Sequence, residues 1–307
     1  MDELVSVIMP TYKRHRDLVK RALDSLLSQT YKNTEIVLVD DNAGDELSGF
    51  RKEIEELAGE YPKVVYVQNE KNFGSAKSRN FGIKKAQGNY ITFLDDDDIY
   101  LKDKIEKQLC FMIENELDMS FTNQILVDKN NRIVDFREYR RIKKFDNKTL
   151  LQYHLSKKIT GTNTFMVKKE ILQSIGGFGG VDMGDEFYLM YNIIKTHCKI
   201  GYLDENEVVA YRAGQSSLTV GEKRLIYEKR LYEFIKKNFN ELTFSQRAYA
   251  RFRYNVTKLI TYKRAKKYGK MLICIVNAFF SSPKSFFVEP FRMRKNLKEI
   301  KKLSLIN

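Results

Sequence analysis

Hydrophobic and polar positions alternate along the first two hundred residues in a pattern typical of a sheet covered by helices. Short apolar runs rich in β-branched residues predict strands. These runs are Leu4–Met9, Glu35–Val39, Val64–Gln68 and Tyr90–Leu94. Longer segments between them carry apolar residues at helical spacing and predict helices. These segments are Arg16–Ser28, Glu46–Glu60 and Ser75–Ala86. The alternation predicts an α/β fold with a mostly parallel sheet.

The regular alternation of predicted strands and helices ends at about residue 116. Two apolar runs, Met119–Val127 and Arg132–Arg137, flank the polar stretch Asp128–Asn131 and predict a hairpin. A glycine-rich loop, Gly176–Gly184, leads into a further helix, and a late strand is expected at Val208–Tyr211. The sheet is therefore expected to become mixed in its second half.

The C-terminal part of the chain differs in both pattern and charge. From Gly221 onward only helical patterns occur. The chain of 307 residues has a formal net charge of +14, but residues 1–219 carry −2 and residues 220–307 carry +16. These features predict an N-terminal domain at 1–218 and a basic helical region at 219–307, with a boundary near Leu218–Gly221.

Composition excludes several classes of protein. A hydrophobic content of 43% is enough to fill a core. Cys110, Cys198 and Cys274 are odd in number and far apart, so they predict neither a disulfide framework nor a zinc site and fit a reducing cytoplasm. The N-terminal residues do not have the pattern of a secretory signal. The longest apolar stretch, Met271–Phe280, has about half of the roughly 20 residues that a spanning helix needs.

The stretch Asp95–Asp98 directly follows the predicted strand Tyr90–Leu94. Four adjacent carboxylates at a buried strand end repel one another and lose hydration unless cations or donors meet them. Carboxylates are hard oxygen ligands, and Mg²⁺ typically takes one or two of them together with substrate phosphates. The stretch therefore predicts a metal-bound diphosphate. The alternative is an acidic turn that caps a helix beginning near Leu101.

Further polar residues are expected at the same edge of the sheet, where ligands bind in open α/β folds. Asp41 follows the second strand, and Tyr12 follows the first, where its ring can stack on a nucleobase. Arg79 lies early in a predicted helix and can neutralise phosphate together with that helix N-terminus. Each residue also has an ordinary structural explanation, namely a turn cap for Asp41, packing for Tyr12 and a surface ion pair for Arg79.

Taken together, three stretches resemble the family 2 glycosyltransferases with a GT-A fold: VSVIMPTY at 5–12, EIVLVDDN at 35–42 and GNYITFLDDDD at 88–98. The likeness continues through Gly176-Gly177-Phe178 and Gly184-Asp185-Glu186. The resemblance implies a Rossmann-like mixed sheet flanked by helices, with a nucleotide-sugar-binding half at about 1–98 and an acceptor half at about 99–218. It also implies inverting transfer of a sugar from a nucleotide-diphosphate donor, usually a UDP-sugar, to an acceptor hydroxyl.

The resemblance also implies roles for individual residues at the donor site. Asp97 matches the metal-binding aspartate of the DxD element, and Asp96 matches the acid near the donor ribose. Asp41 matches the carboxylate that accepts from uracil, and Tyr12 the ring that stacks on it. Backbone at the nucleoside pocket would come from Pro10 and Thr11.

Three more roles concern the reacting groups. Arg79 stands where the family has its diphosphate-binding basic residue. Asp185 matches the catalytic base, which must lie opposite the leaving diphosphate because the acceptor hydroxyl is a weak nucleophile; Glu186 is the competing candidate. The implied cofactor is Mn²⁺ or Mg²⁺. The stretch Tyr211–Gly214 lacks the histidine that many members carry there, which leaves a third protein ligand in doubt.

The basic region suggests where the protein works. Fifteen Phe or Tyr residues are interspersed with its Lys and Arg residues, and cations near an anionic leaflet favour peripheral attachment. We expect a cytoplasmic protein that docks on the inner face of the membrane and acts on a glycan acceptor, which would be lipid-linked in bacterial cell-surface polysaccharide synthesis. In the alternative, these helices bury their apolar stripes against the catalytic domain. The oligomeric state stays open.

Two other functions were weighed against glycosyl transfer. A sugar-phosphate nucleotidyltransferase would carry a glycine-rich signature after the first strand, which Pro10–Arg14 lacks. A non-catalytic module that binds nucleic acid or membrane through the basic region would leave Asp95–Asp98 without a role, so nucleic acid is disfavoured as a partner. Phosphate-loop chemistry is excluded at the motif level, since no GxxxxGK[ST] occurs.

Overall fold

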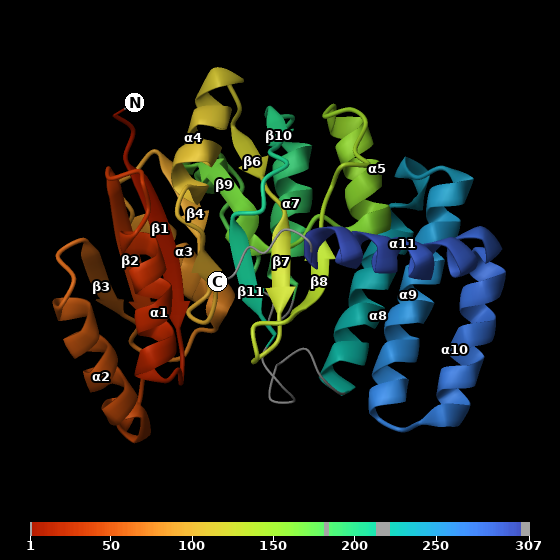
Figure 1. Ribbon diagram of the computed structural model, residues 1–307, viewed down its shortest axis with the longest axis horizontal. Helices are drawn as coiled ribbons and strands as arrows, with labels where there is room; N and C mark the ends of the chain where they lie inside the picture. Colours follow the sequence, from red (N-terminus) through yellow and green to blue (C-terminus); the bar gives the residue numbers. More distant parts are fainter. Residues whose placement is uncertain (1, 181–183, 213–221, 302–307) are drawn as a thin grey trace. The chain divides into compact units, whose positions relative to one another are not determined.

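The computed structural model describes residues 2–180, 184–212 and 222–301, drawn as ribbons in Figure 1. The chain forms two compact units. Unit 1 comprises residues 1–127, 137–141 and 160–211, and unit 2 comprises 128–136, 142–159 and 212–307. The boundary expected near Leu218–Gly221 lies outside the described residues. Unit 2 also includes two segments that precede this boundary.

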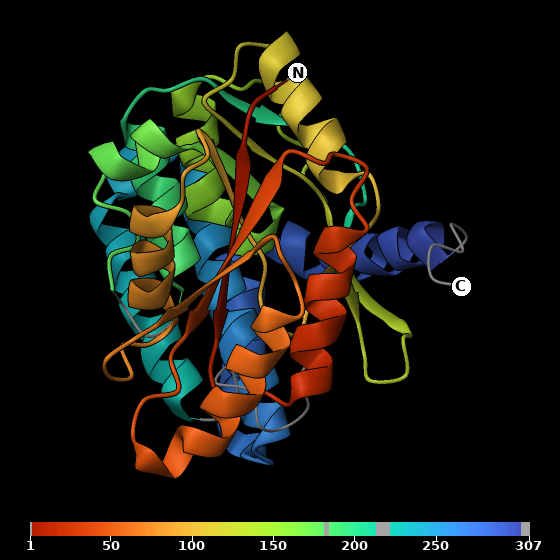
Figure 2. The same ribbon diagram turned by 90° about the vertical axis from the view of Figure 1, so that its left-hand side faces the viewer.

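Unit 1 is built on a seven-stranded sheet with the order β10-β6-β9-β4-β1-β2-β3. Its strands are β1 (Val5–Thr11), β2 (Thr34–Asp40), β3 (Val64–Gln68), β4 (Tyr90–Phe93), β6 (Met119–Phe121), β9 (Phe165–Lys168) and β10 (Ile200–Tyr202). β1 pairs in parallel with β2 and β4, whereas β9 is antiparallel to both β4 and β6. The mixed sheet expected from the sequence is thus confirmed (Figures 1 and 2).

Helices flank this sheet, as the spacing of apolar residues predicts (Figure 2). They are α1 (Arg16–Leu27), α2 (Ser48–Gly59), α3 (Ser75–Lys85), α4 (Lys104–Glu114), α6 (Lys169–Ser174) and α7 (Asp185–Lys195), with short 3-10 turns at Asp45–Leu47 and Thr162–Thr164. Every residue of β1 is buried, as is typical of a central parallel strand covered on both faces. The four strands and three helices predicted for the first hundred residues are present, with ends displaced by at most two residues.

The single strand predicted at Met119–Val127 is wrong, because the structure divides it. β6 belongs to the seven-stranded sheet, and β7 (Gln124–Val127) belongs to a second sheet. Thr122 and Asn123 form the break, and the Asn123 amide donates hydrogen bonds to Asp204 and Asn206. These side-chain bonds hold the chain where it leaves the first sheet, and the apolar pattern carries no sign of them.

The first strand of the second sheet, β5 (Ile99–Tyr100), directly follows Asp95–Asp98 in the chain. β5 pairs antiparallel with β11 (Val208–Tyr211), and β11 pairs in parallel with β7. The polar turn predicted at Asp128–Asn131 is present, with Asp128 accepting from the backbone of Asn130 and Arg132. β8 (Ile133–Arg137) follows this turn.

Unit 2 is mainly helical over its described residues, which confirms the helical pattern of the C-terminal region. Its helices are α5 (Asn147–Lys157), α8 (Glu222–Lys237), α9 (Phe244–Arg264), α10 (Tyr268–Ser281) and α11 (Pro283–Lys301), with a 3-10 turn at Phe239–Glu241. α9 packs against α5, α8 and α10. No described helix is by itself long and apolar enough to cross a membrane; α10 and α11 meet that criterion only as a pair, bent by 106°.

Candidate active site

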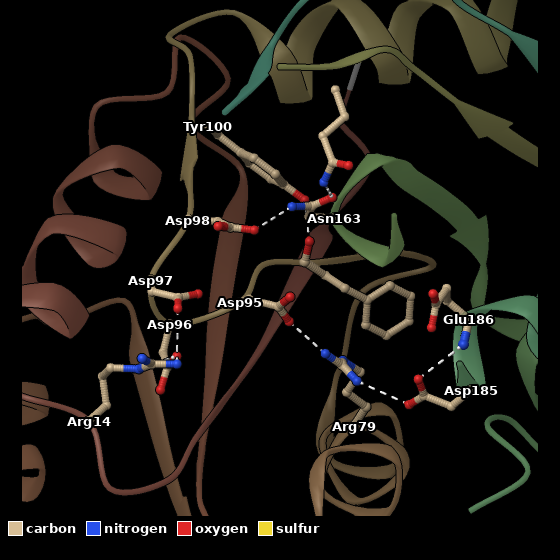
Figure 3. Close-up of polar contacts among 12 residues, drawn as sticks. Arg14, Arg79, Asp95, Asp96, Asp97, Asp98, Tyr100, Asn163, Asp185 and Glu186 are labelled. Carbon is tan, nitrogen blue, oxygen red and sulfur yellow. Dashed lines mark hydrogen bonds and ion pairs between the residues drawn. The ribbon is translucent and has the colours of Figure 1, made fainter. Parts of the chain in front are cut away.

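The polar side chains predicted at the strand ends do meet at one edge of the seven-stranded sheet. Thr11 ends β1 and lies in register with Asp40 at the end of β2. Asp95–Asp98 leave the end of β4, which pairs with β1 on its other side. Because these three strands are parallel, their carboxyl ends share one edge. The stretch Asp95–Asp98 is called the acidic turn, and Figure 3 shows it with the arginines and acids that surround it.

Arg14 neutralises two of the four carboxylates of the acidic turn. Its guanidinium forms ion pairs with Asp96 at 2.8 Å and with Asp97 at 3.1 Å (Figure 3). The Thr11 hydroxyl donates to Asp96 at 2.8 Å. Burial raises the pKa of Asp96 to about 6, against the opposing effect of Arg14. The sequence analysis missed Arg14, although a cation two residues after Tyr12 at an acidic edge was a usable signal.

Arg79 links the acidic turn to the start of α7. It is only 6% exposed, and it forms ion pairs with Asp95 at 2.5 Å and with Asp185 at 3.2 Å (Figure 3). Burial alone would lower the pKa of Arg79, but the two carboxylates raise it above its ordinary value. Its Nε atom is buried and has no hydrogen-bond partner among the described residues. A buried cation with an unused donor is suited to hold an anionic ligand.

The acidic turn is anchored by its last residue. Asp98 is buried and accepts from the Asn163 amide at 2.6 Å and from the backbone of Tyr211 at 2.9 Å. Burial and the adjacent acids raise the pKa of Asp98 well above its usual range. Arg21 stacks on the Tyr211 ring and donates to the carbonyl oxygen of Asp97 at 2.5 Å. Asp98 therefore positions the turn, a role that the sequence did not indicate.

The first part of the glycine-rich loop is bound to α3. The Asn80 amide donates to the carbonyl oxygen of Phe178 and accepts from its backbone N–H, both at 2.8 Å. Gly177 has φ +71°, and a Cβ there would lie 2.3 Å from the Asn80 side-chain oxygen. Only glycine fits this close approach. Residues 181–183 of the loop lie outside the described residues.

Two acids begin α7 and face different partners. Asp185 is buried, pairs with Arg79 and accepts from the backbone of Glu186 at 3.1 Å. Burial, and then the negative charge of Asp185, raise the pKa of Glu186 to about 7. The ion pair keeps Asp185 beside the diphosphate-binding candidate Arg79, whereas Glu186 has the raised pKa that suits proton transfer near neutral pH.

Asp41 is already engaged by the protein. Its carboxylate accepts from the Asn69 amide at 2.7 Å and from the backbone of Phe73 and Gly74, each at 2.9 Å. Gly74 has φ +80° and precedes α3, so Asp41 fixes the entry to the helix that carries Arg79. A carboxylate offers about four acceptor positions, which leaves one for a nucleobase N–H.

Replacement of Asp41 by alanine is expected to lower the free energy of unfolding by about 3 kcal/mol, because three donors lose their charged acceptor. Chemical denaturation measures the loss. Asp41→Asn keeps one acceptor, so its free energy of unfolding should lie between those of Asp41→Ala and the wild type. Asp45→Ala removes an exposed carboxylate and should change the free energy of unfolding little. Equal stability of Asp41→Ala and the wild type would contradict the positioning role.

The remaining residues predicted to contact the nucleoside lie at the same edge of the sheet. Tyr12 is 41% exposed, with the Lys13 ammonium 5.2 Å from its ring centroid. Pro10 is buried in β1 opposite Val39. The stacking role of Tyr12 and the backbone contacts of Pro10 and Thr11 stay predictions.

The acidic turn offers carboxylate ligands to a divalent cation. Among the described residues no group of three or more His, Cys, Asp or Glu side chains is arranged to hold a metal ion. Mg²⁺ needs only one or two carboxylates when substrate phosphates complete its shell. Burial raises the pKa of Asp97, whose side chain is 19% exposed, and the nearby Asp95 adds to the rise. A carboxylate whose pKa stays raised although it pairs with Arg14 fits a metal that arrives with its substrate. Ala213 and Gly214, after the late strand, lie outside the described residues.

The chain matches the family model described as Glycosyl transferase family 2 over residues 6–176. It is 33% identical over 135 residues to an Escherichia coli protein named UDP-Glc:alpha-D-GlcNAc-diphosphoundecaprenol beta-1,3-glucosyltransferase WfgD, covering 44% of this chain and 51% of that protein. It is 39% identical over 132 residues to the putative teichuronic acid biosynthesis glycosyltransferase TuaG of Bacillus subtilis, covering 43% and 51%. Across such curated relatives the matched part spans 19–58% of their length.

Solved structures share the fold of this chain. The structure of S. aureus TarS 1–349 in complex with UDP-GlcNAc superposes with a TM-score of 0.55 at 19% identity, covering 90% of this chain and 91% of that one. At this identity the likeness concerns the fold. The fold is GT-A-type, with a mixed central sheet, flanking helices and a helical C-terminal region, as the resemblance implied.

Proposed function

This chain belongs to glycosyl transferase family 2, and on that premise we propose that it transfers a sugar from a nucleotide-diphosphate donor, a UDP-sugar by preference, to a hydroxyl of a glycan acceptor. The observation that carries the proposal is the Arg79 bridge, in which one buried cation joins the acidic turn at Asp95 to Asp185 on α7. It brings a site for a leaving diphosphate next to a candidate base.

The proposed reaction is a single displacement that inverts the anomeric carbon. Asp185 takes the proton of the acceptor hydroxyl as the oxygen attacks, and the bond to the diphosphate breaks on the opposite face. The guanidinium of Arg79 receives the charge that develops on the leaving diphosphate. In this scheme Arg79 exchanges its carboxylate partners for phosphate oxygens, which frees Asp185 to act as a base.

We propose that the donor binds with Mn²⁺ or Mg²⁺ held by Asp97. When bound, the cation supplies Lewis-acid stabilisation of the leaving diphosphate. Asp96 would contact the donor ribose and Asp41 the base, with Tyr12 stacked on it. Arg14, which pairs with Asp96 and Asp97, is the counter-ion that these acids use before a cation arrives.

The acceptor is proposed from the names of the relatives. WfgD is named for a diphosphoundecaprenol acceptor and TuaG for teichuronic acid biosynthesis. The first name specifies a lipid-linked sugar as acceptor, and the second specifies the biosynthesis of a polymer. We therefore propose a glycan acceptor in cell-surface polysaccharide synthesis, which would be lipid-linked. The two alternatives weighed from the sequence, nucleotidyl transfer and a non-catalytic binding module, receive no support from these names.

The experiment that tests the proposal compares the two acids of α7. With a panel of nucleotide-sugars, Mn²⁺ and a lipid-linked glycan acceptor, the wild type is expected to transfer the sugar to the acceptor hydroxyl and release nucleoside diphosphate, and Asp185→Asn to lose about 10²–10⁴-fold in rate. Glu186→Gln should keep a measurable rate. Because burial raises the pKa of Glu186 to about 7, we expect the rate of the wild type to change more between pH 6 and 8 than that of Glu186→Gln. Absence of turnover with every donor in the wild type would contradict the function, and full activity of Asp185→Asn would contradict the base.

Glu186 should also be visible in the pH dependence of stability. The pKa of Glu186 rises from 4.5 to about 7 on folding, so the folded state holds this proton more tightly than the unfolded chain. Its stabilising contribution is present at low pH and is lost as the pH rises from about 5 to 7. Thermal unfolding of Glu186→Gln should therefore depend less on pH in this window, whereas Glu170→Gln, at an exposed acid of α6, should follow the wild type.

A further inference from the structure

Helix α10 exposes large apolar side chains along one face. Cys274 and Ala278 are buried on the side that packs against α9. Leu272, Val276 and Phe280 recur every fourth residue on another side, and they are 58%, 52% and 76% exposed. Helix α10 thus exposes a row of large apolar side chains, whereas exposed apolar residues on an ordinary surface helix are scattered singly.

Helix α11 continues this apolar surface around the bend. Phe287 and Phe291 are four residues apart and are 60% and 71% exposed. The ring of Phe279 contacts those of Phe280 and Phe287, with centroids 5.4 and 6.1 Å apart. The two exposed stripes therefore meet at the junction of the helices. Six exposed residues form this apolar face: Leu272, Ile273, Val276, Phe280, Phe287 and Phe291.

The surroundings of the apolar face are strongly basic. Residues 242–288 contain ten Lys or Arg residues and not one Asp or Glu. The exposed basic residues at the turn between α9 and α10 and at the adjoining helix ends are Lys263, Arg264, Lys266, Lys267 and Lys270. Lys284 is exposed at the start of α11. At the surface of an anionic membrane, acyl chains lie beneath negatively charged headgroups. The apolar side chains can contact the acyl chains while the basic residues bind the headgroups.

We propose that α10 and α11 dock unit 2 on an anionic lipid bilayer, with the apolar face inserted into the interface and the basic residues bound to headgroups. α10 has 14 residues and is about 21 Å long, short of the roughly 30 Å hydrocarbon core, and one side of it is occupied by α9. These features favour a helix that lies in the interface. A second copy of the chain is disfavoured as the occupant, because two such cationic borders would repel each other.

The docking surface uses no residue of the candidate active site, so it can be tested without donor or acceptor. The full chain is mixed with vesicles of phosphatidylcholine containing 30% phosphatidylglycerol, and bound protein is measured by sedimentation. We expect binding that is at least tenfold stronger than to pure phosphatidylcholine and that weakens between about 50 mM and 500 mM NaCl. Equal binding to both vesicles, or binding to neither, would overturn the proposal.

Substitutions separate the apolar and the charged contributions. Phe280→Ser with Phe287→Ser, and separately Lys266→Gln with Lys270→Gln, are each expected to weaken vesicle binding about tenfold or more while circular dichroism is unchanged. Ile226→Ser is the matched control, because Ile226 is 54% exposed on α8, outside the apolar face. If the wild type instead forms dimers that the Phe280 and Phe287 substitutions dissociate, with no vesicle binding, the face joins two copies and the membrane proposal fails.

Discussion

Replacement of Asp97 by asparagine is expected to abolish the metal-dependent part of donor binding. Asp97 lies at the sheet edge with a partly exposed carboxylate whose only ion-pair partner in the described chain is Arg14. The amide keeps the shape but removes the charge that a divalent cation needs. Since metal stabilisation of a leaving group is worth several kcal/mol, we expect transfer to fall by at least ~100-fold.

The measurement is binding of UDP by calorimetry with and without Mn²⁺. Wild-type protein should bind UDP more tightly when Mn²⁺ is present, and Asp97→Asn should bind it equally weakly in both conditions. Asp45→Asn removes an exposed carboxylate after β2 and should keep the effect of the metal. An unchanged response to Mn²⁺ in Asp97→Asn would show that Asp97 is not the metal ligand.

Replacement of Arg79 by methionine is expected to damage both the fold and the reaction. The change leaves Asp185 as a buried acid without its cation, and removal of one partner of a buried ion pair costs about 3–5 kcal/mol. The side chain of Asp95 is 43% exposed, so loss of Arg79 destabilises this carboxylate less than it destabilises Asp185. We therefore expect a decrease in the free energy of unfolding at the lower end of this range, about 3 kcal/mol. For a unit of this size that corresponds to a decrease in melting temperature of about 6–12 °C.

Activity should fall further than stability explains. Loss of the cation that faces the leaving diphosphate is expected to lower the rate about 10²–10³-fold under conditions where the variant is folded. Arg79→Lys keeps the charge but not the two-pronged geometry, and should recover part of the rate. Lys77→Met, an exposed cation on the same helix, is the control. Full activity in folded Arg79→Met would remove Arg79 from the reaction.

The strand ends of the candidate site were predictable because their chemistry is local. Asp41, Asp96 and Asp97 follow apolar runs directly, and parallel strands bring such positions to one edge. Arg79 was also identified, through its place early in a helix. The roles of Asp98 and Asn163 were not predictable, since they depend on a hydrogen bond between residues 65 positions apart. Arg14 was missed although its place two residues after Tyr12 was a usable signal; its partner Asp96 lies 82 positions away in the sequence.

The amino-acid sequence by itself determined the order of the elements in the first hundred residues, the acidic turn and the uneven distribution of charge, because periodicity and composition are properties of neighbouring residues. Only the tertiary structure decided that Met119–Val127 divides between two sheets, that Asp41 also secures the entry to α3, and that Arg79 joins Asp95 to Asp185. These features arise from side chains that meet after folding, where burial gives a hydrogen bond or an ion pair an energy that no local pattern encodes.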